Sequence, residues 1–332
     1  MTQFNLFDFH PERPAASADA TKVRPAAVSP EIAATAARLP SNVRLGTSSW
    51  SFPGWRGIVY ADATTETTLA RHGLPAYAAH PLLRMVGIDR TYYAPIAAEQ
   101  FAAYASVTPP EFRFLVKAPE LCLIPRFHAR NRQGQPTGVN PRFLDPAFAA
   151  DLIVRPAVDG LGDRLGPIVF QFTPLDLRDL GGVNALLERL RTFLLNLPPG
   201  PLYAIELRNR ELLTERYMEL LAASGVAHCF NVHPSMPKID AQATFLGAAA
   251  GPALVVRWML GGSQRYEEAK DRYSPFDRIV DEDAASRDAI AELIAAAVSR
   301  RQAAYIIANN KAEGSAPRTL ERLASRVVER IG

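Results

Sequence analysis

Eight short apolar runs, separated by stretches with helical periodicity, dominate the sequence from Val43 onward. Most runs are apolar through their whole length, which is typical of strands buried on both faces. Parallel neighbours in a sheet need a crossover connection, and the intervening helical stretches supply it. The predicted strands are Val43–Ser48, Arg84–Asp89, Phe112–Lys117, Pro167–Phe172, Leu202–Arg208, Ala227–Val232, Ala253–Trp258 and Ala304–Ala308.

The segments between the runs carry the pattern of amphipathic helices. Apolar residues in Val183–Leu195 recur at offsets of three, four and seven, which places them on one stripe of a helix. The same periodicity recurs in Ala284–Val298 and in residues 320–331. Pro95 and Pro317 stand where helices are expected to begin, because proline loses no hydrogen bond in the first turn.

The alternation predicts a closed (β/α)8 barrel of the TIM type over residues 43–332. An open, doubly wound sheet is the alternative architecture. No G-x-G-x-x-G turn follows the first strand, so nothing favours a dinucleotide-binding half. The composition, with 48% hydrophobic and 21% charged residues in a chain of 332, is ordinary for a folded globular protein.

Residues 1–42 precede the barrel and are rich in Ala, Pro, Ser and Thr, with a short apolar stretch only around residues 32–39. Such a segment buries little surface, so we predict a flexible arm. Gln3, Leu6 and Phe7 near its start resemble the Q-x-x-L-F peptide with which bacterial proteins bind the DNA sliding clamp. A sliding clamp is therefore one expected partner, and packing of this strip on its own barrel is the alternative.

Composition and motifs limit the other function classes. No apolar run approaches the ~20 residues that span a bilayer, and the start lacks a secretion signal, so we expect a cytoplasmic protein without a membrane partner. The 37 Lys and Arg against 34 Asp and Glu give a net charge of +3, which is too mild for bulk nucleic-acid binding. The six histidines lack zinc spacing and a P-loop is absent, so we expect neither a metal nor a cofactor.

Polar residues end the predicted strands repeatedly, where a parallel barrel gathers its chemistry. Glu206 and Arg208 are two positions apart and share one face of their strand with Ala204. The inward side chains are therefore expected to converge on one pocket. The residues expected at its rim are Asp89, Lys117, Gln171, Glu206, Arg208, Asn231, Arg257, Asn309 and Asn310.

The charges in this set favour a small anionic ligand, because three cations face two carboxylates. Arg208 and Arg257 are expected to clamp a phosphate or carboxylate. Either Glu206 or Asp89 would act as a general base, and Lys117 as an acid or electrostatic stabiliser. A purely structural ion pair between Glu206 and Arg208 is the alternative.

Two loops extend this prediction. Gly262 and Ser263 follow the seventh strand, where barrels often bind phosphate through backbone N–H groups, although ordinary turn chemistry explains them equally well. Trp50 and Tyr93 follow the first two strands and are expected to form a wall that stacks on a sugar or base. Trp55 fits better as a hydrophobic plug of the barrel end.

Taken together, these motifs resemble the DUF72 (YecE-like) family over almost the whole predicted barrel. The family is similar to TIM barrels in fold, and its biochemical function is unassigned. The chain departs from the family pattern at Gly87 and Asp89, where a Glu and an Asn are common, and after Arg257, where a histidine is frequent. The matching motifs are Gly46–Phe52 with Trp55 and Gly57, Thr91–Tyr93, Phe112-x-Phe114-x-x-Lys117, Gly166–Gln171, Glu206-x-Arg208, Arg257 and Asn309-Asn310.

Three functions follow as hypotheses. The first is an enzyme with hydrolase, lyase or isomerase chemistry on a small phosphorylated or carboxylated compound. The second is a nucleic-acid processing or repair factor recruited through the arm, with direct nucleic-acid binding left open. The third is a barrel that binds a ligand without catalysis.

Overall fold

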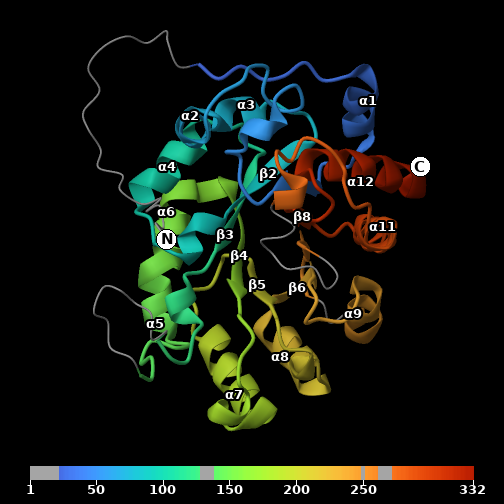
Figure 1. The fold of residues 1–332 in the computed structure, drawn as a ribbon. Coiled ribbons are helices and arrows are strands. Elements are labelled where there is room, and N and C mark those ends of the chain that lie inside the picture. Colours follow the sequence, from blue (N-terminus) through green and yellow to red (C-terminus); the bar gives the residue numbers. More distant parts are fainter. Residues whose placement is uncertain (1–21, 128–137, 248–250, 261–270) are drawn as a thin grey trace.

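Eight parallel strands close into a barrel in which each strand pairs with the next along the chain and β8 pairs with β1 (Figure 1). This computed structural model describes residues 22–127, 138–247, 251–260 and 271–332. The prediction of a (β/α)8 TIM-type barrel is confirmed. The strands are β1 (Val43–Thr47), β2 (Leu83–Ile88), β3 (Arg113–Lys117), β4 (Leu165–Gln171), β5 (Tyr203–Glu206), β6 (Ala227–Val232), β7 (Leu254–Trp258) and β8 (Ala304–Ala308).

Helices surround the barrel and cover the outer faces of its strands (Figure 1). A π-helical turn over Ala150–Val154 joins α5 to α6. The helices are α1 (Pro30–Arg38), α2 (Glu66–His72), α3 (Leu74–Ala78), α4 (Ala98–Ser106), α5 (Pro146–Ala149), α6 (Arg155–Leu161), α7 (Gly182–Leu195), α8 (Glu215–Ser224), α9 (Ile239–Leu246), α11 (Ala284–Ser299) and α12 (Ala316–Ile331).

The alternation of side chains along each strand creates two separate apolar cores. Outward residues such as Ile205 and Val256 pack with the helices in the larger core. Inward residues form a second, smaller core inside the barrel, because successive side chains of a strand point to opposite faces. The inner core consists of Met85, Leu115, Val169, Ala204, Ala227, Cys229, Val255 and Ile307.

The helix predictions hold where the apolar stripe is strong. In α7, Leu186, Leu190 and Phe193 are among the residues buried against the barrel, as their spacing predicts. Pro317 lies in the first turn of α12, as expected. The corresponding prediction for Pro95 is wrong, because α4 begins at Ala98 with Ala97 as its N-cap.

The structure differs from the predicted flexible arm over α1. Ser29 caps this helix by accepting a hydrogen bond from the backbone N–H of Ile32, and Pro30 occupies its first turn. Ala36 and Leu39 are buried where α1 packs against α12. The apolar stretch noted in the sequence therefore finds a surface on which to order. Within the described residues, no helix is long and apolar enough to cross a membrane.

A buried histidine on β6, His228, makes the stability of the folded protein pH-dependent. His228 Nδ1 lies 2.9 Å from the hydroxyl of Tyr217, and its Nε2 lies 3.3 Å from Oε1 of Gln242. Burial lowers the pKa of His228 from 6.5 to about 4. Between these values the unfolded chain binds the proton and the folded chain does not, so stability falls as pH falls.

We therefore expect the melting temperature to decrease between pH 6.5 and pH 4, and to decrease less steeply in His228→Gln. Thermal unfolding followed by circular dichroism across this range measures both slopes. His72→Gln, at an exposed position, is the matched control and should keep the wild-type slope. Parallel profiles for the wild type and His228→Gln would contradict the assignment.

Candidate functional site

A polar layer lies directly above the inner core, toward the carboxyl ends of the strands. On each strand from β3 to β8, the last inner-core residue is followed two positions later by a polar residue. Positions two apart on a strand share a face, so these side chains point into the mouth of the barrel. The six residues are Lys117, Gln171, Glu206, Asn231, Arg257 and Asn309.

Arg257 and Glu206 form the centre of this layer, and both side chains are fully buried. Arg257 Nη1 donates to Glu206 Oε2 at 2.5 Å and to Gln171 Oε1 at 2.6 Å. Arg257 Nη2 donates to Asp89 Oδ2 at 2.9 Å, at the end of β2. One guanidinium thus joins side chains that follow three other strands.

Arg208 completes the cluster from the end of β5. Its Nη2 donates to Glu206 Oε1, the second oxygen of the same carboxylate. Its Nη1 donates to Asn231 Oδ1 at 3.3 Å. These bonds use two of the five N–H groups of the guanidinium, and the other three have no partner among the described residues. Arg208 is therefore the better placed of the two arginines to hold an anion.

The two arginines keep Glu206 ionised. Burial alone would raise the pKa of Glu206, but the positive charges of Arg208 and Arg257 reverse this effect and lower it. For Arg257 the two effects have the opposite signs. Burial alone would lower its pKa, but the carboxylates of Glu206 and Asp89 raise the pKa above its ordinary value. A carboxylate held in this way is a weak proton acceptor near neutral pH. Its geometry suits it to positioning the arginines.

Asp89 has the more accessible of the two carboxylates. Its side chain is 27% exposed, whereas that of Glu206 is inaccessible. Asp89 Oδ2 accepts from Arg257, while its Oδ1 is buried and has no hydrogen-bond partner among the described residues. A buried carboxylate oxygen without a hydrogen-bond partner is uncommon in folded proteins, and this one lies within the charged cluster.

Lys117 differs from the arginines because it forms no ion pair with any residue that the structure describes. Its side chain is 6% exposed, and its Nζ lies 3.9 Å from the centre of the Tyr92 ring. The two carboxylates of the cluster, Glu206 and Asp89, are paired with arginines, and neither forms an ion pair with Lys117. Burial lowers the pKa of Lys117 to about 8, and its attraction to Asp89 opposes this only in part.

Asn309 and Asn310 have different surroundings. Asn309 Nδ2 donates to Ser48 Oγ at 3.0 Å, which links the ends of β8 and β1. Asn310 Oδ1 accepts from Trp55 Nε1 at 3.1 Å and from the backbone N–H of Ala316 at 2.9 Å. The second contact places Asn310 at the start of α12, outside the charged cluster.

The aromatic residues of the predicted wall are also placed apart. Trp50 is 6% exposed, donates to the backbone oxygen of Leu69 and packs edge-on against Tyr104. Tyr93 is 71% exposed and contacts the ring of Tyr92 edge-on at 5.2 Å between centroids. The aromatic surface nearest the charged cluster belongs to Tyr92.

Two of the predicted sites cannot be placed. Gly262 and Ser263 lie outside the described residues, as do Gln3, Leu6 and Phe7. The phosphate-binding loop and the clamp-binding motif therefore stay predictions.

Sequence reasoning missed two neighbours of the cluster, Tyr92 and His233. Burial and, to a smaller extent, the charge of Arg208 lower the pKa of His233 to about 4. His233 Nδ1 contacts Ser235 Oγ, and that hydroxyl donates to the backbone oxygen of Arg208. The missed signal for His233 is its spacing of two from Asn231, which predicts a shared face.

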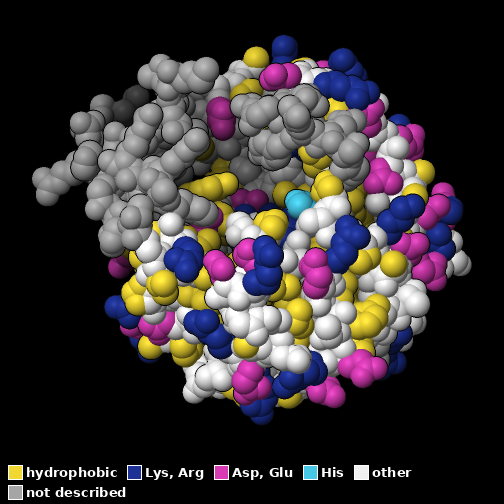
Figure 2. Space-filling model, turned by 60° about the horizontal axis from the view of Figure 1, so that its bottom comes forward, with side chains coloured by type: hydrophobic (Ala, Val, Ile, Leu, Met, Phe, Trp, Pro, Cys, Tyr) yellow, Lys and Arg dark blue, Asp and Glu magenta, His cyan; other side chains and the backbone are white. Residues whose placement is uncertain are grey.

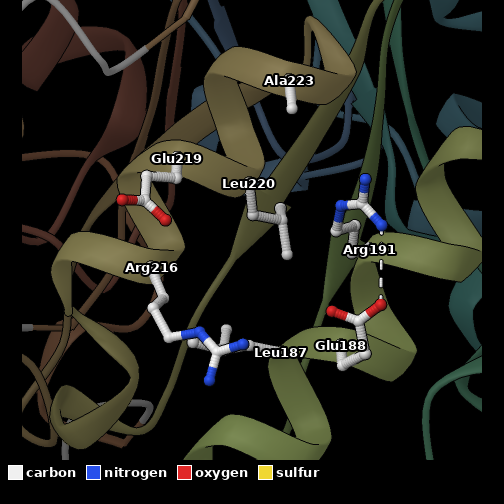
Figure 3. A pocket seen from close by; sticks show the side chains of 7 residues that line it. All are labelled: Leu187, Glu188, Arg191, Arg216, Glu219, Leu220 and Ala223. Atoms are coloured by element: carbon white, nitrogen blue, oxygen red, sulfur yellow. Dashed lines mark ion pairs between the residues drawn. The ribbon is translucent and has the colours of Figure 1, made fainter.

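The remaining surface offers no comparable site among the described residues. A groove of about 200 Å³ between α7 and α8 is lined by Leu187, Leu220, two Glu and two Arg, with Glu188 paired to Arg191 (Figure 3). It lies in the helical layer, and its charges balance. On the face shown in Figure 2, Lys and Arg side chains are interspersed with Asp and Glu and form no continuous basic patch. No cluster of three metal-ligating side chains occurs within the described ranges.

A closed parallel barrel with a charged cluster at the carboxyl ends of its strands defines a TIM-barrel protein. The chain belongs to the DUF72 family, described as "Protein of unknown function DUF72", whose family model matches residues 44–331.

Solved structures of this family share the fold. A DUF72 family protein from Thermotoga maritima MSB8 is 20% identical with a TM-score of 0.57, covering 85% of this chain and 98% of that one. A DUF72 family protein from Enterococcus faecalis V583 is 18% identical with a TM-score of 0.55, covering 87% and 95%. No curated protein matches the sequence.

Proposed function

We propose that this protein is an enzyme that acts on a small phosphorylated or carboxylated substrate at the carboxyl-end mouth of its barrel. The observation that carries the proposal is the convergence of five charged side chains from four strand ends, among which Lys117 has no ion-pair partner in the described part of the chain. Buried charge is costly unless it is matched, and a cluster built only for stability would match it. An anionic group is the missing partner.

The charge balance supports an anion over a cation. Lys117, Arg208 and Arg257 face Glu206 and Asp89, which leaves an excess of one positive charge when Lys117 is protonated. The free N–H groups of Arg208 match the planar geometry of a carboxylate or phosphate.

The contacts assign a different role to each charged residue. Arg208 and Lys117 bind the anionic group, and Glu206 positions both arginines. Asp89 is the general base, because its Oδ1 has no hydrogen-bond partner and its side chain is partly exposed. A hydrolase, lyase or isomerase reaction needs this combination of an anion clamp and a proton acceptor.

Lys117→Met tests the anion site. We expect inorganic phosphate, or citrate as a carboxylate probe, to raise the melting temperature of the wild type. The variant should bind the same anion about 10–100-fold more weakly, since it loses a charged hydrogen bond. Differential scanning calorimetry against anion concentration gives both affinities.

The matched control is Lys22→Met, which removes the same charge from an exposed position far from the cluster in sequence. It should retain the wild-type response. Equal anion stabilisation in Lys117→Met and the wild type, or no response of the wild type to either anion, would overturn the proposal.

Recruitment to a sliding clamp through Gln3, Leu6 and Phe7, and association with nucleic acid, stay predictions. The interspersed charges on the visible part of the face in Figure 2 argue against binding of a long polyanion there.

A further inference from the structure

We propose that Lys117 is a covalent catalyst, whose amine forms an imine with a small aldehyde or ketone that carries a carboxylate or phosphate. This inference rests on the proposed anion site and names the substrate class of that site. Three observations support it. Lys117 is only 6% exposed, its Nζ lies over the Tyr92 ring, and it has no hydrogen-bond partner among the described residues.

The geometry of the cluster leaves the amine available. Lys117 follows Leu115 of the inner core by two positions, so its side chain enters the barrel mouth from β3. Nζ lies over the face of the Tyr92 ring and forms no hydrogen bond or ion pair with a described residue, so no such bond has to break before the nitrogen can react.

The surroundings also favour the neutral, nucleophilic form of the amine. Glu206 and Asp89 are the counter-ions at hand, and both are bound by arginines. With a pKa of about 8, roughly a quarter of the Lys117 amines are neutral at pH 7.5. A lowered pKa would bring no advantage to an ammonium group that served only to attract an anion, because the arginines already carry a permanent positive charge.

The reaction uses groups that the cluster supplies. The neutral Lys117 nitrogen attacks the carbonyl carbon, a C–N bond forms, and the π pair moves to oxygen. Asp89, acting through solvent water, takes one proton from the nitrogen and returns it to that oxygen. The second nitrogen proton follows the same route, so that the C–O bond breaks, the oxygen leaves as water and the C=N bond of the imine forms. The step consumes no oxidant or reductant.

The imine also explains the need for Arg208. When protonated, it draws electrons from a neighbouring C–H or C–C bond, which is the bond broken in isomerase or lyase chemistry. Arg208, with free N–H groups, orients that bond by holding the anionic end of the substrate.

Reductive trapping tests the proposal directly. The full-length protein is incubated with limiting glyoxylate, or with dihydroxyacetone phosphate, and sodium cyanoborohydride, and the adduct is located by peptide mass spectrometry. We expect occupancy at Lys117 to exceed that at exposed Lys22 by about tenfold, because a larger share of its amine is neutral. Excess inorganic phosphate should suppress the adduct at Lys117 and leave that at Lys22 unchanged.

Lys117→Arg keeps the positive charge but removes the nucleophile, and it should lose the adduct while retaining phosphate-induced stabilisation. Wild-type labelling no greater at Lys117 than at Lys22 overturns the imine. If phosphate still stabilises the wild type and not Lys117→Met, the anion site stands and only the covalent role falls. If phosphate stabilises neither, both proposals fall.

Discussion

Glu206→Gln is expected to destabilise the folded protein by about 3–5 kcal/mol, the usual cost of removing one partner from a buried ion pair. Glu206 is fully buried, and its two oxygens accept from Arg208 and Arg257. Glutamine has one acceptor oxygen and no charge, so two buried guanidinium groups lose their shared counter-ion. Urea unfolding followed by tryptophan fluorescence gives the free energy of unfolding of both proteins.

Glu211→Gln is the matched control, because Glu211 is exposed and follows the same strand. It should change the free energy of unfolding by less than about 0.5 kcal/mol. A loss of similar size in the two variants would show that the Glu206 cluster contributes little to folding.

The same residue adds to the acid sensitivity of the protein. The folded-state pKa of Glu206 lies below the ordinary value of 4.5, so its contribution is present above that value and is lost as pH falls through the folded pKa. The difference in stability between the wild type and Glu206→Gln should accordingly shrink at low pH.

Trp55→Ala is expected to cost about 3–5 kcal/mol, as is usual when a buried tryptophan is truncated. Trp55 is fully buried, and its ring packs against Phe52 and Tyr77 at centroid distances of 4.9 and 6.4 Å. Its indole N–H also holds Asn310 at the start of α12. Urea unfolding measures the loss.

Trp55→Phe separates packing from hydrogen bonding, because it keeps an aromatic ring and loses the N–H donor. We expect it to cost less than half as much as the alanine variant. Equal losses would mean that the bond to Asn310, and not the packing of the ring, carries the effect.

The barrel could be predicted because its determinants are local. The stripe of Leu186, Leu190 and Phe193 in α7 is a property of one helix, and the apolar run of β7 is a property of one strand. The start of α4 and the order of α1 could not be predicted. Both depend on neighbours, such as the α12 surface that covers Ala36.

The candidate site was predictable as a set of residues but not as a set of contacts. The spacing of Glu206 and Arg208 places them on one face whatever the rest of the chain does. No local sequence pattern predicts that Arg257 reaches Asp89, a residue 168 positions away. The same holds for the hydrogen bond that Asn310 accepts from the first residue of α12. The contact between Arg257 and Asp89 exists because the closed sheet brings the ends of β2 and β7 to one mouth.

The sequence by itself determined the strand–helix alternation, the inward face of each strand and the polar residues at its end, since each follows from the geometry of a single element. Only the tertiary structure decided how the charges pair. Once the barrel closes, both carboxylates pair with the arginines, and Lys117 is buried without a counter-ion among the residues that the structure describes. The reason is that pairing depends on distances across the barrel, which are set by the closure of eight strands and not by the order of residues in any one of them.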